Sequence, residues 1–555
     1  MKKRLFSVLA LICAMCLVFS ACGQTNTETT KTSGVVADDN VTAPGELPIV
    51  KEKIELTVGI LGTSKVEDFD TNAFTKYLEE KTNIDLNFYL FPASGGYDKV
   101  KVMLASGAEM PDVLCGFGLE KSTLMQYGVE GTLVDLTEYM DNYSYWFNEV
   151  KEKTGIENLD GWLSTADGGK YYMPHITEQA GNKHGGKAFI NKTWLDKLGL
   201  EMPETVDEFV EVMKAFKTQD PNGNGKADEL GFTGSKDGWN EKPVNFIMNS
   251  YIYDDYRDGF VVDDNKKISL NYTSPEYKEG LKKIAEMVQE GLIDVQAYTQ
   301  SSEILRSICN GDDNVVGAFA SGSPDSLFGS GTERLGEYVA LPPLKGPKGV
   351  AYALTAVGAP SVSGIITKYC EHPLAAYRLF DFMMSEEASI FCRYGVEGTD
   401  WKRADESTPA MFGDLGFEAR ILPILPYGAV QNSHWFQYNP AFRSSDVSDT
   451  MAWNGDPLDG EYFKAKALPA YWQKGPKNLV TREQLLLEQA EMDEFNGLQT
   501  DISTHVKENI ALFVTGEKSV DADWDAFQEE LKSLNVERYR ELVQLGYDNF
   551  YATAK

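Results

Sequence analysis

IELTVGIL, at residues 54–61, is a short apolar segment with the character of a β-strand, and four further segments follow it in a regular rhythm. NAFTKYLEEKT (72–82) has the spacing of an amphipathic helix, and IDLNFY (84–89) alternates like a second strand. YDKVKVMLA (97–105) predicts another helix that closes at Gly107, before the strand-like PDVL at 111–114. Strands alternating with helices predict an α/β domain with a largely parallel sheet.

The same rhythm returns further along the chain. Residues 188–190 read as a strand, residues 194–198 as a helix with Gly199 as its C-cap, and residues 206–218 as a helix. Helices are also expected at 275–290 and 373–384, and the region from about Arg482 is strongly helical and charged. With 555 residues, the chain is too long for one core and long enough for two or more domains.

The first residues have the pattern of an export signal. Lys2, Lys3 and Arg4 precede an apolar run, residues 5–19, that is too short to span a bilayer comfortably. Small residues then lead to Cys22, which resembles the lipidated cysteine of a bacterial lipobox, although Phe19 stands where Leu is usual. We expect a signal peptide at 1–21, a lipid on Cys22 and a flexible polar tether over 22–49. An uncleaved N-terminal anchor is the alternative.

Composition excludes one class of partner. Loss of the three basic residues in the signal leaves 49 Lys and Arg against 84 Asp and Glu, a net charge of −35. Such a field repels phosphate backbones, so nucleic-acid binding is not expected. Four body cysteines, at positions 115, 309, 370 and 392, are widely spaced and are expected to be buried free thiols, with one bridge left open.

Five segments in order resemble the family 1 extracellular solute-binding proteins, particularly lipoprotein members that take up oligosaccharides. The segments are YDKVKVMLASGAEMPDVL (97–114), DGGKYYMP (167–174), NKTWLDKLGLEMPETVDEF (191–209), EGLID (290–294) and YGVEGTDW (394–401). The resemblance implies a two-lobed periplasmic-binding-protein-like fold with a hinge and a ligand cleft between the lobes. The expected domains are an N-terminal lobe at 50–172 and 346–435, and a C-terminal lobe at 173–345 and 436–555, the last part mainly helical.

A calcium-like loop stands at residues 220–231, DPNGNGKADELG. Oxygen donors at positions 1, 3 and 5 and a glycine at position 6 match the start of an EF-hand loop, but position 12 is Gly231 instead of a bidentate Glu. The resemblance implies that two nearby acids complete the shell of a structural Ca²⁺. The expected ligands are Asp220, Asn222, Asn224, the Lys226 backbone carbonyl, Asp228 and Glu229. A polar surface turn without metal is the alternative.

No catalytic motif stands out. The five histidines form no HExxH, and neither a GxSxG elbow nor a Walker loop is present, so an enzyme is not expected. Sugar sites instead combine aromatic faces with a few polar groups. Candidate ligand-binding residues are Trp239, Asn240, Trp401, Trp435, Trp453, Tyr97, Tyr143, Trp146, Glu178, Glu397 and Asp400.

These observations predict a lipid-anchored, extracellular protein that binds a carbohydrate, expected to be an oligosaccharide, and passes it to the permease of an ABC importer. We expect a monomer. A peptide-binding importer subunit and an extracellular polysaccharide-degrading enzyme remain as alternatives. The acidic body disfavours a polyanionic ligand unless a local basic patch lines the cleft.

Overall fold

The computed structural model describes residue 35 and residues 38–329, 331–425 and 429–553. The chain divides into two units, residues 1–36 and 37–555, and the fold below is that of the second unit. The predicted signal peptide, the lipidation site Cys22 and the tether as far as residue 34 lie outside the described residues.

A six-stranded mixed sheet forms the first lobe, in the order β14-β4-β11-β3-β1-β2. β1 pairs in parallel with both β2 and β3, whereas β11 runs antiparallel to β3 and β4. This alternation of strand and helix confirms the α/β pattern read from the sequence. The strands are β1 Ile54–Leu61, β2 Ile84–Phe91, β3 Val113–Cys115, β4 Met173–Thr177, β11 Ser361–Ile366 and β14 Ala441–Arg443.

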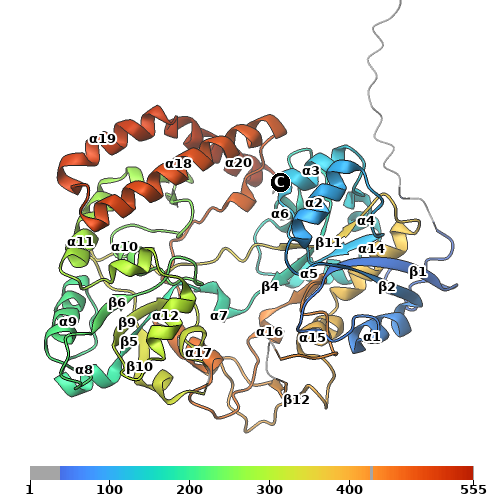
Figure 1. Ribbon diagram of the computed structural model, residues 1–555. Helices are drawn as coiled ribbons and strands as arrows, with labels where there is room; N and C mark the ends of the chain where they lie inside the picture. Colours follow the sequence, from blue (N-terminus) through green and yellow to red (C-terminus); the bar gives the residue numbers. More distant parts are fainter. Residues whose placement is uncertain (1–34, 36–37, 330, 426–428, 554–555) are drawn as a thin grey trace, which may run out of the picture. The chain divides into compact units, whose positions relative to one another are not determined.

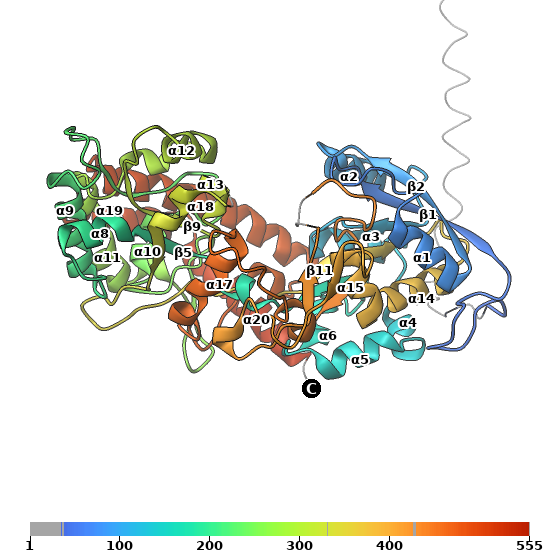
Figure 2. The same cartoon turned by 90° about the horizontal axis from the view of Figure 1, so that it is seen from below.

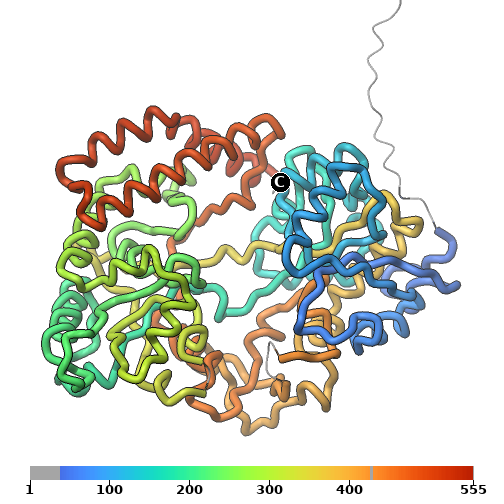
Figure 3. The backbone as a smooth tube through the Cα atoms, viewed as in Figure 1, coloured from blue at the N-terminus to red at the C-terminus, as the bar shows by residue number. Residues whose placement is uncertain are grey.

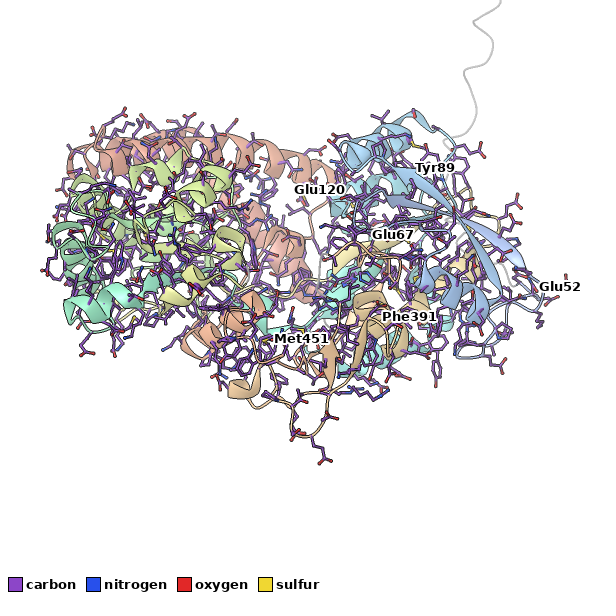
Figure 4. All side chains as sticks on the ribbon, turned by 60° about the horizontal axis from the view of Figure 1, so that its bottom comes forward. Glu52, Glu67, Tyr89, Glu120, Phe391 and Met451 are labelled. Atoms are coloured by element: carbon purple, nitrogen blue, oxygen red, sulfur yellow. The ribbon has the colours of Figure 1, made fainter. Side chains whose placement is uncertain are left out.

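Helices cover this sheet. Helix α1, Ala73–Thr82, begins at Asn72, whose side chain accepts a hydrogen bond from the backbone N–H of Phe74. Its apolar face meets α15, Glu386–Tyr394, where the ring of Phe391 lies 5.5 Å from Phe74 (Figure 4). The remaining helices of this lobe are α2 Gly96–Ser106, α3 Lys121–Val129, α4 Thr137–Asn142, α5 Trp146–Lys153, α6 Leu159–Leu163 and α14 Pro373–Met383.

The second lobe has a four-stranded sheet in the order β10-β5-β9-β6. Every residue of β5 and β9 is buried, as expected of central strands covered on both faces. Helix α9, Val206–Thr218, packs beside the sheet and starts with a reciprocal capping box between Thr205 and Glu208. The strands are β5 Lys187–Asn191, β6 Leu230–Thr233, β9 Val316–Ser321 and β10 Tyr338–Leu341; further helices are α8 Lys192–Leu198, α10 Pro243–Met248, α11 Pro275–Gln289 and α12 Ser302–Cys309.

Three C-terminal helices complete this lobe, which confirms the predicted helical end. They are α18 Gln489–Thr515, α19 Val520–Ser533 and α20 Val536–Ala552, and their buried residues belong to the same core as β5, β9 and α11. The end of α20 also contacts α6 of the first lobe (Figures 1 and 2). At this contact the rings of Trp162 and Phe550 lie 5.4 Å apart. The C-terminal helices therefore touch both lobes.

The chain passes between the lobes three times (Figure 3). The passages join β4 to β5 through α7, Ala180–Lys183; β10 to β11; and β14 to α17, Gly460–Tyr471. Because β4 and β14 both belong to the first sheet, the crossings follow Thr177 and Arg443, slightly later than the boundaries predicted at 173 and 436.

The predicted tether also needs a correction at its end. Residues 38–49 are docked on the first lobe, where Val41 forms a β-bridge with Val50. The fully buried Arg378 donates from Nη1 to the carbonyl of Thr42 at 2.8 Å. The polar composition of this segment predicted a flexible chain. Instead, backbone carbonyls of the segment accept hydrogen bonds from the buried guanidinium of Arg378.

Candidate functional site

A cavity of about 480 Å³ lies where two of the crossing segments meet the second lobe. Asn182 and Gly185 come from the first crossing, and residues 354–359 come from the second. The rest of the wall belongs to the second lobe. Its lining residues there are Trp239, Asn240, Tyr253, Asp255, Tyr256, Arg257, Asp258, Leu479, Val480, Thr481 and Glu483.

Trp239 supplies the exposed aromatic surface of this cavity, since 50% of its side chain is accessible. Its ring lies against Gly322, just beyond the end of β9, and its carbonyl accepts a hydrogen bond from the Gly322 N–H at 2.9 Å. A Cβ at position 322 would stand 2.4 Å from the ring, so only glycine permits this placement. An exposed, supported indole face of this kind suits stacking on an apolar ligand face.

Residues 255–258 form another part of the wall, and the loop that carries them is held by its own carboxylates. Asp255 Oδ1 accepts hydrogen bonds from the backbone N–H groups of residues 257, 258 and 259, at 2.9–3.0 Å. Asp254 Oδ1 accepts from the Tyr256 N–H at 2.8 Å and from the Asn245 amide at 3.1 Å. These hydrogen bonds fix the turn of the loop from within the second lobe.

Two carboxylates of this wall, Asp258 and Glu483, are paired with arginines. Arg482 Nε donates to Asp258 Oδ1 at 2.7 Å, and Arg257 Nη1 lies 3.4 Å from Glu483 Oε1. Burial raises the pKa of Asp258 in spite of Arg482. Burial, with the neighbouring charge of Asp255, raises the pKa of Asp254 to about 7.

A larger cavity of about 570 Å³ lies on the other side of the same loop, beneath α18. Its wall includes Tyr272, Tyr277, Ile502 and Tyr539, all buried within the second lobe. None of the crossing segments lines it. The smaller cavity is our candidate site because two crossing segments line it and because it contains an exposed aromatic face.

Two of the predicted ligand-binding residues, Trp239 and Asn240, line the candidate cavity. Trp435 needs a correction, because its side chain is completely buried between Phe74 and Phe88 and donates to Thr75 Oγ1. The other aromatic candidates also lie outside the cavity wall. Trp401 is buried and donates to the Gly395 carbonyl, Trp453 stacks on Tyr462, Tyr97 donates to the Gly118 carbonyl, Tyr143 ends α4, and Trp146 packs on Phe382.

The three predicted acids are likewise engaged elsewhere. Glu178 Oε1 accepts from Thr154 Oγ1 and the Gly155 N–H, and Glu397 pairs with Arg403 at 2.9 Å. Asp400 Oδ2 accepts from the Val396 N–H at 2.8 Å. None of these three side chains lines the candidate cavity.

Sequence reasoning missed most of the wall. Tyr253, Asp255, Tyr256, Arg257 and Asp258 form a dense run of aromatic and charged residues, YDDYRD at 253–258. That run, placed after a helix and before a glycine, was the available signal. Thr355, Thr481 and Glu483 carry no local signal, because only the fold brings them to this wall.

The calcium-like loop follows α9, and none of its residues lines the candidate cavity. Asp220 accepts backbone hydrogen bonds from Gly223, Asn224 and Gly225, which curls the loop around its carboxylate. Asp228 accepts from the side-chain amides of Asn222 and Asn224 at 3.2–3.4 Å. The loop thus gathers oxygen groups on its inner side.

One carboxylate oxygen of this loop is buried and has no hydrogen-bond partner in the part of the chain that the structure describes. Glu229 is 3% exposed, and its Oε1 has no hydrogen-bond partner among the described residues. Burial and the nearby Asp228 and Asp220 raise the pKa of Glu229. In the described part of the chain no three His, Cys, Asp or Glu side chains gather closely enough to hold a metal. Amide and backbone oxygens would therefore have to contribute, and the donor set fits a hard cation.

Two further observations concern the body of the protein. Within residues 38–329, 331–425 and 429–553, no helix combines the length and apolarity needed to cross a bilayer. Cys115, Cys309, Cys370 and Cys392 are all buried free thiols, as the sequence predicted.

The family model for the bacterial extracellular solute-binding protein matches residues 62–390. A fructooligosaccharide ABC transporter substrate-binding protein, FusA of Streptococcus pneumoniae, is 24% identical over 100% of this chain and 99% of its own. Lipoprotein LipO of Bacillus subtilis is 27% identical over 64% of this chain and 68% of its own. The polygalacturonan/rhamnogalacturonan-binding protein YtcQ of Bacillus subtilis is 22% identical over 60% of this chain and 64% of its own.

Solved structures show the same two-lobed fold. FusA in complex with kestose superposes with a TM-score of 0.71 at 22% identity, covering 90% of this chain and 99% of that one. An EF-hand mutant of FusA in complex with fructo-nystose gives 0.70 at 21% identity with the same coverage. An HMO-binding solute-binding protein of Bifidobacterium longum infantis gives 0.72 at 21% identity, also with 90% and 99% coverage. The predicted fold class is confirmed.

Proposed function

This chain belongs to the bacterial extracellular solute-binding protein family, and from that premise we propose that it captures an oligosaccharide and delivers it to the permease of an ABC importer. The observation that carries the proposal is the cavity at the lobe crossings, with the half-exposed Trp239 on one wall. The relatives named for fructooligosaccharide and HMO binding support it. No catalytic step is part of the proposal.

Capture works through lobe movement. The crossing segments line the cavity, so rotation of the lobes about them changes the distance between its walls. A ligand that contacts both the second lobe and the crossings stabilises the closed arrangement. Trp239 would stack on a pyranose or furanose face, while Asn240 and Thr355 would bond hydroxyl groups.

A structural Ca²⁺ is the second part of the proposal. Asp220, Asn222, Asn224, the Lys226 carbonyl, Asp228 and Glu229 would hold it, and the partnerless Oε1 of Glu229 supports this assignment. A bound Ca²⁺ would offset two of the three negative charges that these carboxylates carry. The EF-hand of FusA, the subject of a mutant structure, is a further support.

The rest of the proposal concerns where in the cell the protein acts. Lys2, Lys3, Arg4 and Cys22 lead us to propose export, lipidation and attachment to the outer face of the cell membrane. Such anchoring would keep the protein beside its permease. We propose that it acts there as a monomer.

A thermal-shift screen tests the proposal. The purified protein with Ca²⁺ is heated with a panel of oligosaccharides and peptides, since ligands that bind only the native state raise the melting temperature. A dose-dependent rise with one glycan class, and recovery of that glycan intact, is the expected result. A rise with peptides alone, or recovery of a cleaved glycan, contradicts the proposal.

A further inference from the structure

The candidate cavity is acidic. Asp255, Asp258 and Glu483 line it, whereas Arg257 is the one basic residue among the described lining residues. The remaining wall consists of aromatic, amide, hydroxyl, aliphatic and glycine groups. Relatives in this family include one named for a fructooligosaccharide and one named for polygalacturonan, so membership leaves the charge of the ligand open.

The single lining cation is already engaged. Arg257 faces Glu483 at 3.4 Å, and this pair belongs to the cavity wall itself. The guanidinium of Arg482 is bonded to Asp258. Both of these guanidinium groups therefore have a partner carboxylate that lines the cavity.

Of the lysines near the cavity, Lys183 and Lys121 are also occupied. Lys183, next to the lining residue Asn182, holds its ammonium 5.5 Å from the ring centre of Trp472. Lys121, near Glu483, donates to the Gly161 carbonyl, and burial lowers its pKa to about 7. Neither lines the cavity.

We propose that this cavity selects uncharged oligosaccharides and rejects those that carry uronate carboxylates. The inference rests on the proposed function and names its ligand class. A uronate entering the cavity loses water and meets the carboxylates of Asp255 and Glu483. Arg257, the one basic residue among the described lining residues, is already paired, so the desolvation of the uronate is not compensated. Hydroxyl groups, by contrast, find acceptors in those same carboxylates and donors in the amide of Asn240.

Matched sugar pairs test this selection. Oligosaccharides of equal length and linkage are compared, one with hydroxymethyl groups at C6 and the other with carboxylates, as in galactotriose and trigalacturonate. For the pair whose neutral member binds, we expect the acidic member to bind at least about 100-fold more weakly, or about 2.7 kcal/mol. Calorimetry at about 0.15 M salt and again at 1 M salt separates the local effect from the overall net charge, because added salt screens only the latter strongly.

A substitution with a matched control locates the effect. Glu483→Gln releases Arg257 and leaves an amide oxygen that still accepts from hydroxyl groups, so the ratio of acidic-sugar affinity to neutral-sugar affinity should rise several-fold. Glu494→Gln breaks the equivalent pair with Arg538, whose Nη2 lies 2.7 Å from Glu494 on the C-terminal helices, and should change neither affinity. Melting temperatures of both variants confirm that each is folded.

The outcomes are distinct. Equal or tighter binding of the acidic member overturns the selection but leaves oligosaccharide capture standing. An unchanged preference in the Glu483→Gln variant also overturns it, because the wall charges then do not set the preference. Binding of peptides with no glycan bound removes the proposed function and the inference with it.

Discussion

Arg482 Nε donates to Asp258 Oδ1 at 2.7 Å, and this pair joins the cavity loop to the segment that leads into the C-terminal helices. The Asp258 side chain is 3% exposed, and the Arg482 side chain is 34% exposed. The residues are 224 positions apart in sequence. The wall of the site is thus tied to the part of the second lobe that also touches the first lobe.

We expect Arg482→Ala to destabilise the protein by about 3–5 kcal/mol, because it leaves Asp258 buried without its partner. Urea unfolding measures the change. Arg257→Ala is the control, since its pair with Glu483 is exposed on both sides and should cost only about 0–1 kcal/mol. Equal losses in the two variants would show that the buried pair does not hold the wall.

Trp239→Ala should weaken glycan binding by about 2 kcal/mol or more, roughly 30-fold, because the exposed indole face is lost. Calorimetry with the glycan identified by the thermal screen measures this effect. Trp453→Ala removes an indole that stacks on Tyr462 at 4.3 Å outside the cavity, so it should lower stability without changing affinity. Similar affinity losses in both variants would remove Trp239 from the site.

Local patterns predicted the regular elements well. The strand at 54–61 and the helix at 206–218 have the predicted bounds, because apolar periodicity and a capping box act within a few residues. The fold class followed from repetition of that rhythm and from the family resemblance. The docked segment at 38–49 escaped prediction because its partner, Arg378, is remote in sequence.

The site was harder to predict because its walls are assembled over long distances. Trp435 stands in a polar segment, SHWFQY, that reads as a loop, yet its partner Thr75 is 360 residues away and buries it. Trp239 was a candidate because of its loop context alone, and it lines the candidate cavity. Glu483 could not be predicted as a site residue, because nothing in the sequence around it indicates that it pairs with Arg257 in the cavity wall.

Chelation should lower the melting temperature of the native protein, because Ca²⁺ bound only to the folded loop stabilises it by mass action. We expect Asp228→Asn to abolish most of the Ca²⁺-dependent rise, as one carboxylate is lost from the shell. Asp263→Asn is the control, because Asp263 makes similar turn hydrogen bonds to residues 265 and 267 in a different loop. Calcium dependence that persists in the Asp228→Asn variant would contradict the assigned ligands.

Stability should fall between about pH 4 and pH 7 through Asp254. Burial raises the pKa of this carboxyl to about 7, above its unfolded value, so the native state holds a proton that the unfolded chain has released. The stabilising contribution is complete below the unfolded pKa and is lost as the pH rises through 7. Asp254→Asn keeps the Oδ1 acceptor for Asn245 and removes this dependence.

The measurement must separate Asp254 from groups with the opposite sign. Burial lowers the pKa of His175, His184 and His434 to about 4, so their contribution is present above about 6.5 and is lost as the pH falls toward 4. These histidines remain in the variant, and subtracting its unfolding free energy from that of the wild type cancels them. The difference should favour the wild type most at low pH and shrink toward pH 8. A difference independent of pH would show that Asp254 is ionised in the native protein throughout this range.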